Sequence, residues 1–284
     1  MTYDSPRALR TALEHRLVTR SKESKIPLDR LRRRVMFERL VLRLERAEPG
    51  VWVLKGGMAL EVRLGDQARL TKDVDLGLRG ITADAGAIRE RLIDALGEDV
   101  DGDGFVFEVG VVKRTAEDGA GLVSWRAGVK VSLAGKQFGG IKVDISPRPY
   151  ELVATDRMTI PTALDFAGAE PVEMEVIDIH RHAAEKLHAM LRTYQDGGSS
   201  RVRDLIDLML LLEHERLVPA ILARTVTTVW QERDHVPPPQ PFPGLPQGWP
   251  TPYEQLATEH QVKPPTFREA SGRAVALWAE MFPS

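Results

Sequence analysis

The stretch Lys55–Asp75, KGGMALEVRLGDQARLTKDVD, decides the fold expected for this chain. It follows an apolar run, residues 51–54, that is typical of a buried strand. The pair Gly56-Gly57 then predicts a turn into a helix that ends near residue 65. Glycine lacks a Cβ, so this backbone can approach a phosphate closely, and the first N–H groups of the helix would point at the anion. The simpler alternative is a tight strand-to-helix turn with no ligand.

Two aspartates, Asp73 and Asp75, follow at spacing i, i+2 where a second apolar run begins. Residues at this spacing in a strand point to one face, so the carboxylates lie side by side while Val74 and Leu76 face the core. Such oxygen ligands suit magnesium, which in turn binds nucleotide phosphates. The alternative is a solvated strand edge. The glycine pair and the aspartates, in this order, favour a metal-dependent nucleotide site.

A third carboxylate, Asp144, lies in the alternating run 141–146, IKVDIS. Ile141, Val143 and Ile145 fall on one face of the predicted strand and Asp144 on the other. If this strand lies beside that of Asp73, the three carboxylates form a cluster that could hold two metal ions. Asp144 would then be a metal ligand and a proton acceptor. The alternative is a surface aspartate before the turn at Pro147.

Composition excludes several classes of protein. The 284-residue chain contains no cysteine, so disulfides and thiolate metal sites are absent. It shows neither the apolar core of a signal peptide nor a run of roughly 18 apolar residues long enough to span a membrane. We therefore expect a soluble, cytoplasmic protein that does not bind membranes.

Charge is distributed unevenly along the chain. Residues 1–46 hold 13 Lys/Arg and 6 Asp/Glu, a net charge of +7, although the whole chain carries −2. The densest cluster is Arg30, Arg32, Arg33 and Arg34. A basic helical arm of this kind is typical of a surface that holds RNA phosphates. A solvated helix face with local ion pairs explains the same pattern equally well.

The remaining pattern predicts an α/β (α+β) fold, with a small mixed β-sheet core, N-terminal helices and a helical C-terminal region. Helices are expected at 6–20, 28–46 and 83–96, short strands between 105 and 145, and helices at 178–193, 199–215, 253–260 and 267–281. Ser199 or Ser200 would cap the second of the later helices. Residues 237–252 contain eight prolines and predict an irregular crossing. We expect a nucleotidyltransferase domain at 1–157 and a mainly helical domain at 158–284.

Four motifs together resemble one known family. They are the Lys-Gly-Gly of 55–57, the Thr-Lys-Asp-Val-Asp of 71–75, the Glu-Lys-Leu-His-Ala of 185–189 and the Arg-Asp-Leu-Ile-Asp-Leu of 203–208. In this order they resemble the AbiEii/AbiGii nucleotidyltransferase toxins of type IV toxin–antitoxin systems, which include the MenT toxins. The first two motifs alone indicate only the wider DNA polymerase β-like superfamily. Many members of that superfamily carry Gly-Ser in place of Gly-Gly, whereas Gly-Gly is common in the toxins.

The resemblance implies roles for several residues. Asp73 and Asp75 would be metal ligands, Lys186 a contact to nucleotide phosphate, and Asp207 an acid needed for catalysis. Lys55, Gly56, Gly57, Thr71 and Arg203 complete the nucleotide-binding set that we expect. Thr71 would contact a phosphate or accept a phosphoryl group that silences the enzyme, or would only cap the start of the strand. Asp207 would orient Arg203 or Lys186, or would form a surface ion pair, and helical spacing does not separate these readings.

These observations predict an enzyme that transfers NMP from an NTP to an RNA 3′-hydroxyl, with Mg²⁺ or Mn²⁺ as cofactor. The acceptor end of tRNA is the expected target, so aminoacylation and translation would stop. An antitoxin protein is the expected partner. Two alternatives stay open: transfer of NMP to a protein or small molecule, and a non-catalytic protein that binds nucleotide or RNA. The second is disfavoured by the presence of all three carboxylates.

Overall fold

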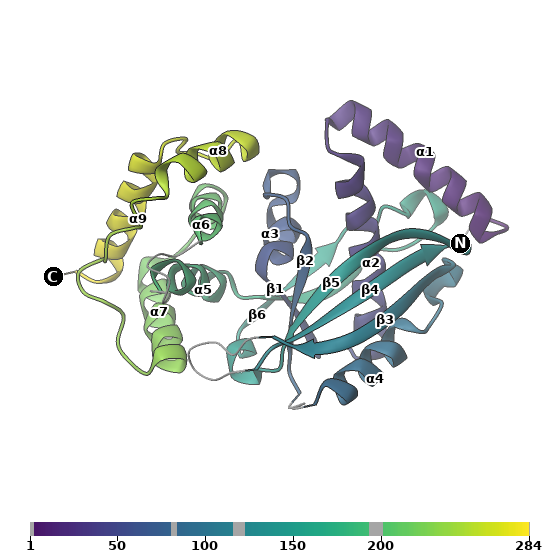
Figure 1. The fold of residues 1–284 in the computed structure, drawn as a ribbon, viewed down its shortest axis with the longest axis horizontal. Helices are drawn as coiled ribbons and strands as arrows, with labels where there is room; N and C mark the ends of the chain where they lie inside the picture. Colours follow the sequence, from purple (N-terminus) through teal and green to yellow (C-terminus); the bar gives the residue numbers. More distant parts are fainter. Residues whose placement is uncertain (1–2, 81–83, 116–122, 193–200, 284) are drawn as a thin grey trace. The chain divides into compact units, whose positions relative to one another are not determined.

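The computed structural model describes residues 3–80, 84–115, 123–192 and 201–283 (Figure 1). The chain forms two compact units. The first contains the chain up to Met58, the stretch from Leu70 to the third strand, and Val123–Val176. The second contains Ala59–Arg69 and the chain from Ile177 onward. Residues 158–176 thus belong with the sheet rather than with the later helices, and residues 59–69 belong with the later helices.

The first unit is built on one mixed sheet with the strand order β3-β4-β5-β2-β1-β7-β6. The central strand β2 is antiparallel to β1 and parallel to β5, and β1 is parallel to β7. The strands are β1 (Trp52–Lys55), β2 (Asp73–Leu78), β3 (Phe105–Arg114), β4 (Trp125–Leu133), β5 (Lys136–Ser146), β6 (Thr155–Ile160) and β7 (Val172–Ile177).

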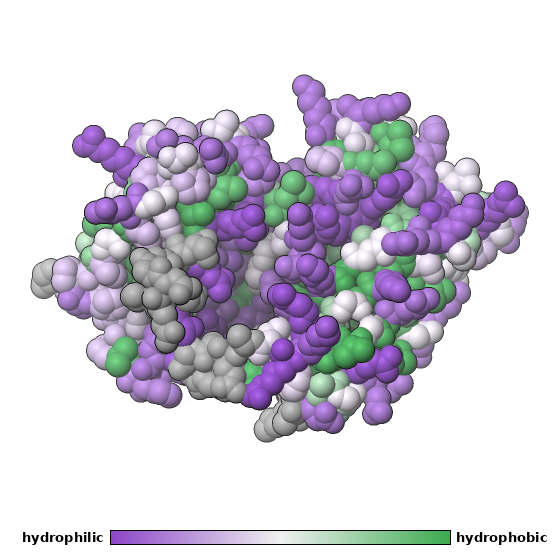
Figure 2. All heavy atoms as spheres, viewed as in Figure 1, coloured by the Kyte–Doolittle hydropathy of each residue, from purple (hydrophilic) through white to green (hydrophobic). Residues whose placement is uncertain are grey.

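One face of this sheet is covered by helices and the other is exposed along β3, β4 and β5. Helices α2 (Leu28–Ala47) and α4 (Ala85–Leu96) pack against the covered face (Figure 1). Buried and exposed residues alternate along β4, from Trp125 to Leu133, because successive side chains point to opposite faces of a strand. In the space-filling view, hydrophilic residues and patches of hydrophobic residues both lie over these strands (Figure 2).

Helix α1 (Pro6–Ser24) begins at Ser5, whose side chain accepts a hydrogen bond from the N–H of Ala8. Proline at the first helical position and a serine cap are strong signals for a helix start. Only Leu9, Leu13 and Leu17 of this helix are buried. These leucines recur every four residues and form a narrow apolar stripe, so most of α1 faces solvent.

The second unit is a helical bundle with its own hydrophobic core. Its helices are α5 (Ile179–Leu191), α6 (Val202–His214), α7 (Pro219–Asp234), α8 (Pro250–His260) and α9 (Phe267–Met281), together with most of α3 (Gly56–Leu64). Asp178 caps α5 by accepting a hydrogen bond from the N–H of Arg181. Leu60 and Leu64 of α3 belong to the same apolar core as Trp230 and Trp278.

The predicted fold class is confirmed, and most predicted elements lie within a few residues of the observed ones. Strands β6 and β7 and helix α7 were not predicted. Ser199 and Ser200, the predicted caps of α6, lie outside the described residues, and Arg201 occupies the N-cap position. None of the helices in the described part of the chain has both the length and the apolar character needed to cross a membrane.

Candidate active site

The three aspartates lie on adjacent strands of the first unit. Asp75 of β2 is the register partner of Asp144 of β5, and Asp73 lies two residues before Asp75. All three are half-buried, whereas their strand neighbours Val74 and Val143 are buried. The predicted alternation and the predicted strand pairing are both present. The register and the alternation therefore place the three carboxylates on one face of the sheet.

A row of charged residues crosses the sheet at this level. Lys55 pairs with Asp75, Asp75 with Asp144, and Asp144 with Arg126 of β4. Arg126 donates two hydrogen bonds to Asp144, from Nε to Oδ1 at 2.6 Å and from Nη2 to Oδ2 at 2.7 Å. These bonds, and the negative charge of all three aspartates, raise the pKa of Arg126. Sequence reasoning missed Arg126, because only the register of β4 against β5 places it beside Asp144.

The chemistry of this set suits a hard metal ion, since three carboxylates on neighbouring strands supply oxygen ligands of the kind magnesium prefers. As the side chains lie, no group of three or more His, Cys, Asp or Glu in the described residues converges closely enough to hold an ion. The physical reason is that Asp144 is held by Arg126, while Asp75 lies against the backbone of Gly56. Metal ligation by Asp73, Asp75 and Asp144 stays a prediction.

The glycine pair makes room for β2. Gly56 opens α3 directly with φ of +58°, a conformation that glycine adopts without strain. A Cβ at Gly56 would lie 1.8 Å from Oδ2 of Asp75, and one at Gly57 would lie 2.6 Å from Oγ1 of Thr71. Both glycines are thus required by the close approach of β2 side chains to the start of α3, whether or not a phosphate also binds there.

Thr71 and Lys55 are both buried and contact partners within the protein. Thr71 is buried, and its hydroxyl donates a long hydrogen bond of 3.4 Å to the carbonyl of Asp73. This local bond is what a cap at the start of a strand would make. The ammonium of Lys55 is also buried and lies 2.5 Å from the carboxylate of Glu151. A phosphate role for Lys55 would require it to leave this partner.

A second polar cluster lies within the helical unit. Nζ of Lys186 on α5 lies 2.9 Å from Oδ1 of Asp204 and 2.8 Å from Oδ2 of Asp207, both on α6. Arg69 holds Asp207 from another side, with Nε at 2.6 Å from Oδ1 and Nη2 at 2.9 Å from Oδ2. Two cations and two anions thus balance in a nearly solvent-free site, where the Lys186 side chain is 12% exposed and Asp207 is 0% exposed.

Electrostatics keep this cluster charged. Burial alone would raise the pKa of Asp207, but Lys186 and Arg69 lower it to about 2. Burial would likewise lower the pKa of Lys186, and Asp207 and Asp204 raise it instead. The neighbouring His182 behaves in the opposite way, since burial and then Lys186 lower its pKa to about 3. His182 is therefore neutral, and neither of its ring nitrogens has a hydrogen-bond partner in the described structure.

The contacts of Asp207 distinguish between the roles predicted for it. Asp207 contacts Lys186, as one reading predicted, and the surface ion pair is wrong because the side chain is fully buried. Arg203 is exposed, and the arginine that holds Asp207 is Arg69. Arg69 lies outside every motif considered, so local sequence gave no signal for it.

The arginines of the basic arm lie on α2 and are largely engaged within the first unit. Arg30 is buried. Arg32 forms an ion pair of 2.7 Å with Glu14 of α1, and Arg33 donates a hydrogen bond of 3.0 Å to the carbonyl of Thr71. Arg32, Arg33 and Arg34 are all half-buried. Their predicted role in RNA binding stays a prediction.

A mixed sheet that carries an Asp-x-Asp strand beside a third aspartate, with a glycine pair opening the neighbouring helix, defines a nucleotidyltransferase-like core. The family profile described as "Nucleotidyl transferase AbiEii toxin, Type IV TA system" matches residues 39–276. The chain therefore belongs to the AbiEii nucleotidyltransferase toxin family of type IV toxin–antitoxin systems, as the four motifs predicted.

A solved structure has the same fold. It is the nucleotidyltransferase toxin MenT4 of Mycobacterium tuberculosis H37Rv, at 18% identity and a TM-score of 0.58 over 97% of this chain and 90% of that chain. No curated protein sequence matches the chain.

Proposed function

We propose that this toxin transfers NMP from an NTP to an RNA 3′-hydroxyl, with the acceptor end of tRNA as the target. A bond forms between the 3′-oxygen and the α-phosphorus, the bond from that phosphorus to the leaving oxygen breaks, and pyrophosphate departs. The observation that supports this chemistry best is the in-register pair Asp75 and Asp144, with Asp73 beside them, on one face of the sheet.

Each carboxylate has a defined task in this proposal. Asp73 and Asp75 would hold Mg²⁺ or Mn²⁺, and Asp144 would serve as a further ligand and as the acceptor of the hydroxyl proton. A bound divalent ion supplies neutralisation of the phosphate charge and lowers the pKa of a coordinated hydroxyl. Positioning and charge neutralisation account for most of the catalysis in phosphoryl-type transfers, so this small set of groups is sufficient.

Lys186 is proposed to contact a nucleotide phosphate. An ammonium has three N–H donors, and the two carboxylates at 2.8 and 2.9 Å account for two of them. The two aspartates keep the lysine charged, as a point contact to phosphate requires. The N–H groups at the start of α3, together with Thr71 and Arg203, remain proposed nucleotide contacts on the strength of the family motifs.

The biological outcome follows from the acceptor. A tRNA whose 3′ end carries an extra nucleotide cannot be aminoacylated, so translation and growth stop. Such an enzyme acts where NTPs and tRNA are present, in the cytoplasm, and an antitoxin must neutralise it in the producing cell.

The decisive experiment is to incubate the purified chain with total RNA, Mg²⁺ and each NTP labelled at the α-phosphate. We expect label on the 3′ end of tRNA, and at least about 100-fold less with Asp73→Asn or Asp75→Asn, since a metal contact is worth several kcal/mol of transition-state stabilisation. Asp94→Asn, an exposed aspartate on α4, is the matched control and should label RNA normally.

Three outcomes would contradict the proposal. Label on protein or small molecules, with none on RNA, would establish a different acceptor. No label with any NTP would make the chain a binding protein. Normal labelling by both aspartate variants would remove the carboxylates from the site.

A further inference from the structure

The basic charge of the N-terminal region separates into two sets in the structure. The arginines of α2 are engaged internally, as Arg32 is with Glu14. The cations on α1 and just after it lack such partners among the described residues. Five cations there are exposed and form no ion pair with a carboxylate in the described part of the chain. They are Arg7, Arg16, Arg20, Lys22 and Lys25.

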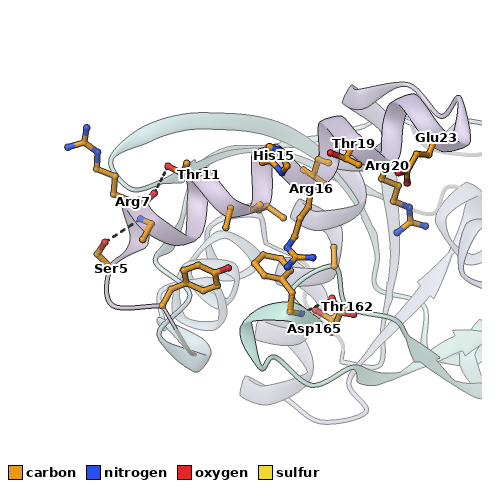
Figure 3. A pocket seen from close by; sticks show the side chains of 17 residues that line it. Ser5, Arg7, Thr11, His15, Arg16, Thr19, Arg20, Glu23, Thr162 and Asp165 are labelled. Carbon is orange, nitrogen blue, oxygen red and sulfur yellow. Dashed lines mark hydrogen bonds between the residues drawn. The ribbon is translucent and has the colours of Figure 1, made fainter.

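Three of these cations, Arg7, Arg16 and Arg20, line a groove within the first unit. The groove runs between α1 and residues 162–166 and has a volume of about 1290 Å³. Arg16 reaches from α1 over the ring of Phe166, with its guanidinium carbon 4.2 Å from the ring centre, and Arg20 points the same way (Figure 3). Tyr3 meets Phe166 edge-on, with ring centres 5.7 Å apart. Arg7 extends away from this pair of arginines (Figure 3).

We propose that this groove binds a single-stranded segment of the RNA substrate, which deepens the proposed function and rests on it. Bases in single-stranded RNA stack on aromatic rings and on guanidinium planes, and Arg16 over Phe166 offers both in one stack. Arg20 lies one helical turn from Arg16, about 6 Å along the axis, where it meets a backbone phosphate. Lys22 and Lys25 extend the positive charge beyond this end of α1.

The composition of the groove favours RNA over a protein partner. The centres of protein interfaces are depleted of lysine and acidic residues and are anchored by apolar, aromatic and arginine side chains that enter pockets on the partner. Here the leucines that line the groove, Leu13 and Leu17, are buried in the unit itself, and the ring of Phe166 is covered by a cation. Glu23 and Asp165 also line the groove, so its lining is mixed, while α1 as a whole holds five Lys/Arg and two Glu.

The test measures RNA binding without NTP, so that it does not depend on catalysis. Fluorescence anisotropy with a labelled short single-stranded RNA gives the affinity of the full chain at several salt concentrations. The variant is Arg16→Gln with Arg20→Gln, and both residues are exposed, so the fold should be kept. The matched control is Arg224→Gln with Arg268→Gln, two exposed arginines of the helical unit with the same change in charge.

We expect the affinity of the groove variant to depend less steeply on salt. The magnitude of the slope of log affinity against log salt should fall by about 1.4, since each phosphate contact to a single strand contributes about 0.7. Phe166→Ala should weaken binding roughly 5- to 150-fold through lost stacking and leave the slope nearly unchanged. The control should match the unmodified chain. Ultraviolet crosslinking should attach the RNA to the peptide that contains Phe166.

Equal slopes for the groove variant and the control would overturn the proposal. A lower slope seen only in the variant Arg32→Gln with Arg33→Gln would also overturn it, because the RNA would then lie on α2. So would a groove variant that loses affinity for a purified antitoxin while its RNA binding stays intact. Failure of the proposed reaction would give a different result from failure of the groove proposal, because the chain would then bind RNA through the groove but label none of it.

Discussion

Replacing Asp207 by asparagine should cost far more stability than replacing Asp73, although both changes should abolish transfer. Asp207 is fully buried and faces two cations, Lys186 and Arg69. Asparagine keeps the volume and removes the charge. A balanced buried cluster would then carry a net charge of +1, while Lys186 retains only Asp204.

The expected loss is about 3–5 kcal/mol, the range found when one partner of a buried ion pair is removed. At roughly 2–4 °C per kcal/mol for domains of this size, the melting temperature should fall by about 6–20 °C. Asp73 is half-buried at the start of β2. Its replacement should therefore change stability by no more than about 0.5 kcal/mol.

Differential scanning calorimetry without metal or nucleotide is the assay, because a bound ligand would stabilise the folded state and mask the difference. A double variant adds a sharper measurement. When Arg69→Gln is added to Asp207→Asn, the remaining charges of Lys186 and Asp204 balance again. The double variant should therefore be more stable than the sum of the two single losses predicts. A coupling of at least about 1 kcal/mol is expected.

Two results would refute this reasoning. If Asp207→Asn melts within about 0.5 kcal/mol of the unmodified chain, the carboxylate is not the buried counter-ion that the contacts indicate. If Asp73→Asn loses several kcal/mol, its carboxylate is a structural element of the sheet, and loss of transfer would no longer report on a metal.

Three further predictions concern other parts of the structure. Gly56→Ala should destabilise the fold by roughly 2–4 kcal/mol in urea titrations, because a Cβ would meet the carboxylate of Asp75 and φ is +58°; an unchanged midpoint would contradict this. Arg126→Gln should tighten Mn²⁺ binding about tenfold by electron paramagnetic resonance, since a competing cation is gone, whereas Lys130→Gln, on the same strand face about 13 Å away, should not. Burial lowers the pKa of His182 to about 3, so this side chain stays neutral in the folded protein, whereas in the unfolded chain it takes up a proton below about pH 6.5. The free energy of unfolding should therefore fall by about 1.4 kcal/mol per pH unit as the pH is lowered from 6 to 4.5. His182→Leu should remove that part of the slope, and an unchanged slope would show that other groups cause it.

The sequence predicted the strands that carry the three aspartates well, because their signals are local. Alternation around Asp144 and the i, i+2 spacing of Asp73 and Asp75 need only the two-residue period of a strand to be read correctly. The start of α3 at Gly56 was equally local. Helix α7 was missed although Leu222, Val226 and Val229 recur at helical spacing behind Pro219, so in that case the signal was present and unused.

Contacts between distant segments could not be predicted in the same way. The bonds of Arg126 to Asp144 depend on how β4 pairs with β5, and a shift of one residue would place the arginine on the opposite face. Arg69 and Asp207 are 138 positions apart, and no periodicity links them. The interpretation of the Arg30–Arg34 cluster as a free surface depended on composition, which does not reveal that Glu14 faces Arg32.

Helix α3 has a consequence for the order in which this protein folds during synthesis. Its first residues, Gly56 to Met58, belong to the sheet unit, and the rest of the helix belongs to the helical unit. The sheet can close once β7 has left the ribosome, at Ile177. Leu60, Leu64 and Ala68 have no core to enter until the helices after Ile177 have also been made. A nascent chain that pauses after β7 has emerged would therefore expose an apolar strip directly behind its glycine pair, at a stage when a chaperone could bind it and before the helices that carry Lys186 and Asp207 have folded.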